Sequence, residues 1–206
     1  MRKGFTLLEM LIVIGISGML SAIAIVYSSV ARNQVALSVE TAKIADVILS
    51  AKSLAITTYA QGGVGTACGY GAAFNVAANT YSVFAYEPKD YPPEHDAAPP
   101  CPDNTIAELS PIHTDEMVQY SPSTWNTPLA NGVKFEDGGS GDDLYVVLFY
   151  PPNPDTFISR DAPGGAPQTF LDPAVVNPVT SKVYLITADG SASAAISVNG
   201  AGQVTF

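Results

Sequence analysis

Basic residues are scarce in this chain of 206 residues. It carries nine Lys and Arg against 19 Asp and Glu, which gives a net charge of −10 at pH 7. A field of that sign repels a phosphate backbone, so we expect no nucleic acid among its partners. The length suits one ordinary domain with a short additional segment and excludes a large multidomain enzyme.

The N-terminal part has little charge and no proline. The 23 residues from Phe5 to Tyr27 carry one charge, Glu9, and are long enough to cross a hydrocarbon core of roughly 30 Å as a helix. Because Arg2 and Lys3 precede this span, the N-terminus is predicted to be cytoplasmic and the remainder extracytoplasmic. No proline occurs before Pro88, so we expect the helix to continue beyond the membrane.

The second half of this helix is predicted to be amphipathic. Beyond Arg32, mostly apolar residues recur every three or four positions, at Leu37, Thr41, Ile44, Ile48, Ala51 and Ala55. The charged residues fall largely off this stripe, at Glu40, Lys43, Asp46 and Lys52. The helix is expected to end before Gly62 and Gly63, which gives it a length of roughly 80 Å, with the stripe covering the core of a downstream head.

Short strands are predicted to build that head. Alternating residues predict a hairpin over 70–86, and further strand patterns occur at 132–135, 144–150, 182–187, 194–198 and 203–206. Asn199-Gly200 is a strong hairpin signal between the last two strands. The proline-rich stretches 88–111 and 151–178 are interpreted as long loops. The fold class is therefore α+β, with a long N-terminal helix packed on an antiparallel sheet.

Glu9 is the most informative residue of the span. An ionisable group near the start of a membrane helix costs a few kcal/mol unless it finds a partner. A cut between Gly4 and Phe5 would create an ammonium group on Phe5, which a neighbouring subunit could bring to Glu9. Two alternatives leave Glu9 unexplained: a signal peptide cleaved before Ile25, after Ala22-Ile23-Ala24, and a plain single-pass anchor.

The residues Arg2-Lys3-Gly4-Phe5-Thr6-Leu7-Leu8-Glu9, followed by an unbroken apolar helix, resemble the class III signal of the type IV pilin and pseudopilin superfamily. The resemblance implies cleavage after Gly4 by a prepilin peptidase, N-methylation of Phe5, and pairing of Glu9 with the amine of an adjacent subunit during assembly. It implies a leader over 1–4, a transmembrane and filament-core helix over 5–30, and an extracytoplasmic head over 31–206 that includes the second half of the helix. Unlike many pilins, this chain has no proline near Val26.

The resemblance predicts a structural subunit. No catalytic motif is found, so we expect no enzyme and no catalytic residues. The chain is expected in the bacterial inner membrane, and then as a minor component of a type IV pilus or a type II secretion pseudopilus. Its implied partners are the prepilin peptidase, other pilin or pseudopilin subunits and the inner-membrane assembly platform. The alternative is a monomeric, membrane-tethered or secreted β-rich binding module.

The layout is most similar to the GspH/FimT-type minor pilins. This finer resemblance rests on a helix rich in serine and alanine around Ser53-Leu54-Ala55, and on a final hairpin that ends in Gly202-Gln203-Val204.

Within the span, small residues indicate a face for close helix packing, at Gly15, Gly18 and Ala22. Small residues are also common in membrane helices that make no such contact.

The two cysteines, Cys68 and Cys101, are expected to form a disulfide in an oxidising space. Free thiols are the alternative.

An acidic, glycine-rich loop is the one candidate metal site, with Asp137, Asp142 and Asp143 as possible Ca²⁺ ligands. A solvated turn is the alternative reading, and no other cofactor is expected.

Overall fold

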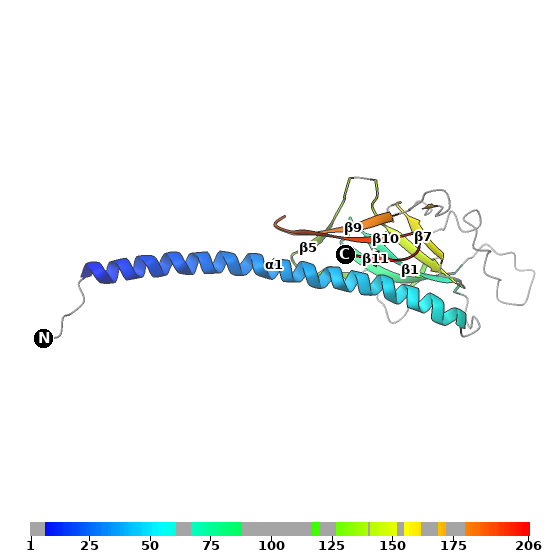
Figure 1. The fold of residues 1–206 in the computed structure, drawn as a ribbon, viewed down its shortest axis with the longest axis horizontal. Coiled ribbons are helices and arrows are strands. Elements are labelled where there is room, and N and C mark those ends of the chain that lie inside the picture. The colour runs from blue at the N-terminus through cyan, green and yellow to red at the C-terminus, as the bar shows by residue number, and fades with distance from the viewer. Residues whose placement is uncertain are drawn as a thin grey trace, which may run out of the picture.

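The computed structural model describes residues 7–60, 67–87, 117–119, 127–139, 141–151, 155–161, 169–171 and 180–206. Within these ranges the chain forms one long helix and two antiparallel sheets, and half of the helix extends away from the sheets (Figure 1). The predicted α+β fold, a long N-terminal helix packed on antiparallel β-structure, is confirmed.

Helix α1 (Leu7–Ala60) contains 54 residues and spans about 80 Å at 1.5 Å per residue. Its second half packs on both sheets, and every member of the predicted stripe is buried there: Leu37, Thr41, Ile44, Ile48, Ala51 and Ala55. The three- and four-residue spacing places these side chains on one side of the helix, so the helix itself forms one wall of the core.

Two sheets form the head. The seven-stranded sheet has the order β3-β2-β1-β6-β7-β8, with β4 also paired to β2; its strands are β1 (Gly69–Asn75), β2 (Thr80–Tyr86), β3 (Met117–Gln119), β4 (Thr127–Pro128), β6 (Val146–Tyr150), β7 (Asp155–Ser159) and β8 (Phe170–Leu171). The four-stranded sheet has the order β11-β10-β9-β5; its strands are β5 (Val133–Glu136), β9 (Thr180–Thr187), β10 (Ser193–Asn199) and β11 (Val204–Thr205).

The main core lies between α1 and the two sheets. Its completely buried side chains come from all three elements: Ile44, Ile48, Phe74, Phe149, Leu185 and Ile196. Phe74 of β1 meets Phe135 of β5 edge to face, with ring centroids 6.1 Å apart. A second cluster, which includes Phe84, Leu148 and Phe157, is buried on the other face of the larger sheet. Both faces of β1 and β2 are therefore covered.

The hairpin predicted over 70–86 is confirmed as β1 and β2, paired from Gly69 with Tyr86 to Asn75 with Thr80. Its turn places Asn79 at a φ of 53°, a left-handed conformation that asparagine tolerates. The Asn79 side-chain oxygen accepts a hydrogen bond from the Phe135 amide at 2.8 Å. The turn thus ties the larger sheet to β5 of the smaller one.

The final hairpin is also confirmed, although its turn differs from the expected two-residue Asn-Gly turn. The left-handed glycine is Gly202, and Gly200 has no positive φ. The Asn199 carboxamide oxygen accepts hydrogen bonds from the amides of Ala201 at 3.1 Å and Gln203 at 2.9 Å. Asn199 therefore supplies the side-chain acceptor that organises a longer loop.

Two predictions about the head were wrong. The stretch 151–178, interpreted as a loop, contains β7 and β8, and β7 pairs along its whole length with β6. Glu40, placed off the buried stripe, has a side chain that is only 1% exposed. The other proline-rich stretch, 88–111, lies outside the described residues.

Candidate functional site

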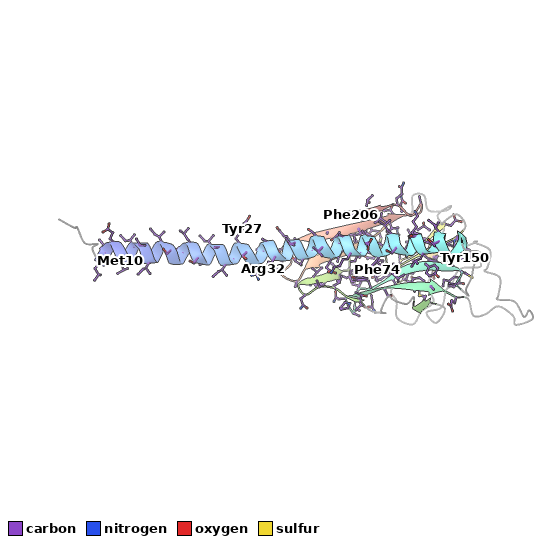
Figure 2. All side chains as sticks on the ribbon, turned by 90° about the horizontal axis from the view of Figure 1, so that it is seen from below. Met10, Tyr27, Arg32, Phe74, Tyr150 and Phe206 are labelled. Atoms are coloured by element: carbon purple, nitrogen blue, oxygen red, sulfur yellow. The ribbon has the colours of Figure 1, made fainter. Side chains whose placement is uncertain are left out.

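The first half of α1 is an apolar helix without an intramolecular partner surface. Every residue from Leu7 to Ser29 is exposed, and its side chains project on all sides of the helix (Figure 2). Within the described residues, α1 is the one helix that is long and apolar enough to cross a membrane, and none of its most apolar stretch is buried. So large an apolar surface requires a bilayer or other chains to cover it.

Polar groups in this half of α1 are few, and two of its serine hydroxyls are bonded within the helix itself. The Ser21 hydroxyl donates to the Ser17 carbonyl at 2.8 Å, and the Ser29 hydroxyl donates to the Val26 carbonyl at 2.8 Å. A hydroxyl bonded within its own helix can enter an apolar environment at low cost. The span is therefore suited to lipid or to a packed helix bundle.

Glu9 lies in the first turn of α1, and its carboxylate is favoured there by the positive end of the helix dipole. It is the one charged residue between Leu7 and Tyr27. Gly4 and Phe5, the residues predicted to flank the cleavage point, lie outside the described residues. The cleavage, the methylation and the pairing of Glu9 stay predictions, as do the boundaries at residues 4 and 30.

Gly15, Gly18 and Ala22 lie on the exposed half of the helix. A β-carbon at Gly15 or Gly18 would meet nothing within 4 Å, so neither glycine is required by the fold of a single chain. Their proposed role in close helix packing is consistent with this free space and stays a prediction.

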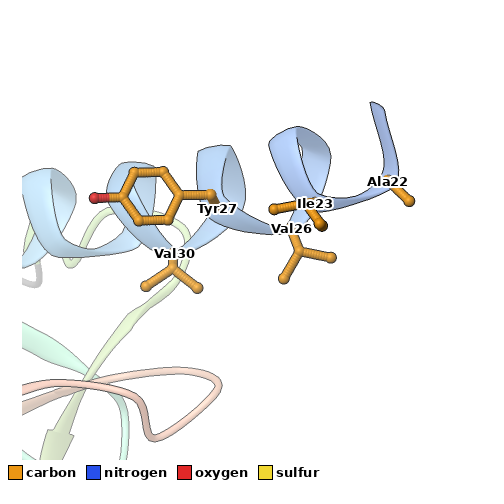
Figure 3. A pocket seen from close by; sticks show the side chains of 5 residues that line it. All are labelled: Ala22, Ile23, Val26, Tyr27 and Val30. Carbon is orange, nitrogen blue, oxygen red and sulfur yellow. The ribbon is translucent and has the colours of Figure 1, made fainter. Parts of the chain in front are cut away.

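An apolar hollow of about 430 Å³ lies on α1 just before the helix reaches the head (Figure 3). Its lining comes from consecutive turns of one helix face: Ala22, Ile23, Val26, Tyr27 and Val30. Figure 3 shows the Tyr27 ring along the helix, with its hydroxyl directed toward the head. An aromatic ring with a polar tip is typical of the boundary between hydrocarbon and water, which places this hollow at the end of the span.

The head holds the helix at Asn33, a contact that the sequence did not reveal. The side-chain nitrogen of Asn33 donates a hydrogen bond to the Asp189 carboxylate, in the β9–β10 turn, at 2.7 Å. Hydrogen bonds from Thr187, Ser191 and Asn33 hold the pKa of Asp189 well below its usual range. Since 156 residues separate Asn33 from Asp189, no local motif could have predicted the pair.

A second anchor lies further along the helix. Lys52 donates to the Gly202 carbonyl at 3.1 Å, and its ammonium lies 6.0 Å from the centroid of the Phe149 ring. The helix is thereby bonded to the turn after β10 and packed on β6. Together with the Asn33 contact, this fixes the head at both ends of the buried half of α1.

The predicted calcium loop uses its carboxylates internally. Asp143 accepts from the Gly138 amide at 2.9 Å, and Asp137 accepts from the Gly139 amide at 3.1 Å. Asp142 accepts from the Tyr184 hydroxyl and pairs with Lys182 at 3.3 Å. Partial burial raises the pKa of Asp143, and the nearby Asp137 raises it further.

Within the described residues, no group of three or more His, Cys, Asp and Glu side chains is placed to hold a metal ion. Calcium binding at the loop stays an untested prediction.

Cys68 is buried, and its amide donates to the Tyr86 carbonyl at 2.8 Å at the start of the β1–β2 hairpin. Cys101 lies outside the described residues, so the Cys68–Cys101 disulfide stays a prediction.

Residues 1–25 match the family described as the prokaryotic N-terminal methylation motif. The match covers the signal and most of the span, and the head lies outside it. No curated protein and no solved structure matches the chain. The motif is that of a type IV pilin-like substrate of prepilin peptidase, which is expected to assemble with other pilins. The exposed apolar half of α1, most of which the motif covers, fits anchoring in a membrane.

Proposed function

We propose that the chain is a structural, non-catalytic subunit of a type IV pilus or a type II secretion pseudopilus, present as a minor component of GspH/FimT type. The observation that carries this proposal is the continuity of α1. The methylation motif covers most of the first half of this helix, which is completely exposed, and the second half forms a wall of the head core. One continuous helix therefore joins the exposed span directly to the core of the head.

Rigid continuity suits a subunit that must leave the bilayer. A tethered binding domain needs only an anchor, and a flexible linker would serve it well. Here the contacts of Asn33 and Lys52 join the helix to the head at both ends of its buried half. Force applied to either part is transmitted to the other, as extraction of a subunit into a filament requires.

In this proposal the maturation steps prepare the N-terminus. Prepilin peptidase cleaves after Gly4 and methylates the new amine of Phe5. The Phe5 amine, still positively charged, pairs with Glu9 of an adjacent subunit and so neutralises a carboxylate that is costly in an apolar surrounding. The inner-membrane assembly platform then draws the span out of the bilayer into the filament core.

The mature N-terminus tests this proposal. Mass spectrometry of the chain from its own membranes should find methylated Phe5 as the first residue, and Gly4→Val should leave the full-length precursor. A chain that begins at Met1 would indicate a tether, and one that begins at Ile25 would indicate a secreted module. Either result would overturn the proposal.

A further inference from the structure

The apolar hollow on α1 lies on the same face of the helix as the buried stripe. Ile23 and Val30 line the hollow, and two further steps of seven residues reach Leu37 and Ile44, which are buried under the head. Seven residues are close to two helical turns, so these side chains share one face. Figure 3 shows Val26 and Val30 pointing to the side of the helix on which the head lies. The hollow therefore lies directly in front of the edge of the head that faces the span.

The β9–β10 turn forms this edge of the head beside the helix. Its Asp189 carboxylate accepts a hydrogen bond from the Asn33 side chain at 2.7 Å, and Asn33 follows Val30, the last residue of the hollow, by about one turn. Asp189 and Gly190 are exposed, and a β-carbon at Gly190 would meet nothing within 4 Å. An open carboxylate thus lies about one helical turn beyond an apolar hollow.

The Asp189 carboxylate is held in place and keeps its charge. Its Oδ1 accepts from the amide and the hydroxyl of Ser191 at 3.1 and 2.7 Å, and its Oδ2 accepts from Asn33. Hydrogen bonds from Thr187, Ser191 and Asn33 hold its pKa well below the usual range, so the group is ionised at neutral pH. In the part of the chain that the structure describes, no lysine or arginine pairs with Asp189. The turn therefore presents a fixed negative charge to the membrane side of the head.

The depth of the hollow and the carboxylate in a bilayer matches that of one phospholipid. From Leu7 to Tyr27 the helix rises about 30 Å, which is the thickness of the hydrocarbon core. Asn33 lies six residues or about 9 Å beyond Tyr27, and the headgroup layer on each side of the core is about 5–8 Å thick. With the core over 7–27, the hollow reaches the acyl chains, and Asp189 lies at the outer surface of the headgroups.

We propose that the hollow and Asp189 bind one phospholipid with a primary amine in its headgroup, with an acyl chain in the hollow and the ammonium group on the Asp189 carboxylate. In such a lipid the amine is the outermost group, which is the order that the hollow and the carboxylate follow along the helix. A primary ammonium supplies a positive charge and three N–H donors, so it both pairs with the carboxylate and donates to it. An anionic headgroup would instead be repelled by Asp189 and by a chain of net charge −10. The site belongs to the membrane-inserted chain and does not depend on later entry into a filament.

Lipid selectivity of the wild-type full-length chain tests the headgroup. The chain is purified in a neutral detergent at pH 7, washed free of lipid, and mixed with equal amounts of phosphatidylethanolamine, phosphatidylcholine and phosphatidylglycerol that carry the same acyl chains. Native mass spectrometry then measures how much of each lipid is bound. Phosphatidylethanolamine should be retained about fivefold more than either of the others, since choline has no N–H donor and the glycerol headgroup has no cation. Equal retention of the three lipids, no retention, or a preference for phosphatidylglycerol would overturn the inference.

Two variants test the residues, each against a matched control. Asp189→Asn should reduce the preference to within about twofold, whereas Glu136→Gln, at an exposed acid of β5, should keep it. Ala22→Phe fills the hollow and should lower the binding of all three lipids by about fivefold, whereas Ala24→Phe, at an exposed residue that does not line the hollow, should bind like wild type. A preference that survives Asp189→Asn, or equal binding by the two phenylalanine variants, would contradict the site. The comparison of lipids on wild type requires no variant to fold and decides the headgroup by itself.

Discussion

Gly71 shows how tightly the head is packed around single residues. It lies in β1, and a β-carbon added there would overlap both the Phe84 ring and the Val147 carbonyl oxygen. The carbonyl belongs to the backbone of β6, so the neighbouring strand would have to move. The absence of a side chain at residue 71 is thus what lets β1 lie between β2 and β6 with Phe84 packed over it.

Gly71→Ala should therefore destabilise the head by about 1–3 kcal/mol, the usual cost of overpacking a core. Thermal unfolding of the full chain in detergent measures the change. Gly18→Ala is the matched control, because a β-carbon at Gly18 meets nothing within 4 Å. Equal unfolding midpoints for the two variants would show that β1 and β6 can separate without cost.

Asp189 makes the folding stability of the head depend on pH. Its pKa is lowered by hydrogen bonds that the folded state makes from Thr187, Ser191 and Asn33. A carboxyl group with a lower pKa in the folded state stabilises that state above its unfolded pKa, and the contribution disappears as the pH falls toward the folded pKa. The contribution is complete near neutral pH, begins to fall at about pH 4 and is lost as the pH approaches the folded pKa.

Asp189→Asn should remove this part of the acid sensitivity. The unfolding midpoint of wild type should exceed that of the variant near pH 7, and the difference should shrink as the pH falls below about 4. Asp46→Asn serves as a control, since Asp46 makes no hydrogen bond or ion pair among the described residues. A constant difference between wild type and Asp189→Asn across this range would contradict the assignment.

At the scale of elements, α1 and the larger sheet enclose an acid. The Glu40 side chain is 1% exposed; one carboxylate oxygen accepts from Lys43 at 2.6 Å, and the other has no hydrogen-bond partner among the residues that the structure describes. Burial, and then the negative charge of Glu40, raise the pKa of the adjacent Tyr81 on β2. Lys43 is 54% exposed and still reaches the buried carboxylate from one turn away. The helix thus brings its own counterion to the junction with β2.

Removing only the lysine should be harmful because it leaves a buried carboxylate without its counterion. Lys43→Met should lower the unfolding midpoint, whereas the double variant Glu40→Leu with Lys43→Met should return it to the wild-type level or above. Buried ion pairs can often be replaced by apolar residues without loss. A double variant as unstable as Lys43→Met would mean that Glu40 contributes to the fold in another way.

The elements that sequence predicted well are those with a local cause. The absence of proline and the stripe from Leu37 to Ala55 were sufficient to predict α1. Alternating residues with turn residues between them were sufficient to predict the hairpins at 70–86 and 194–205. β7 was missed because Pro151, Pro152 and Pro154 precede its short apolar run, and its pairing with β6 is what makes it a strand. Glu40 was misplaced for a similar reason, since its burial depends on β2.

The candidate site divides in the same way. Glu9, the apolar span and the signal are contiguous, so they could be recognised from the first 30 residues. The contact of Asn33 with Asp189 depends on where the head meets the helix, and tertiary structure alone brings these two residues together. The hollow beside Tyr27 is lined by one face of α1, from Ala22 to Val30, so helical spacing alone groups its residues.

At the scale of the whole molecule, two surfaces with opposite requirements share one helix. The second half of α1 is stable in water because the head covers its buried stripe, from Leu37 to Ala55, and the first half is apolar on all sides. A single chain cannot bury both halves. The exposed half must lie first in the bilayer and then among other helices. Glu9 is the one charged residue of this half, so its carboxylate is the group whose free energy differs most between the two surroundings.

Recovery of wild type and Glu9→Leu in sheared filaments is the most direct test of assembly. Both chains should enter the membrane and lose residues 1–4, since leucine removes a costly carboxylate from the span and leaves the cleavage point unchanged. Wild type should then be found in the filaments and Glu9→Leu should be absent, while the unfolding midpoint of the head stays the same in both. Incorporation of Glu9→Leu at the wild-type level would contradict the pairing of Glu9 with the Phe5 amine, and absence of wild type from the filaments would contradict a role as a subunit.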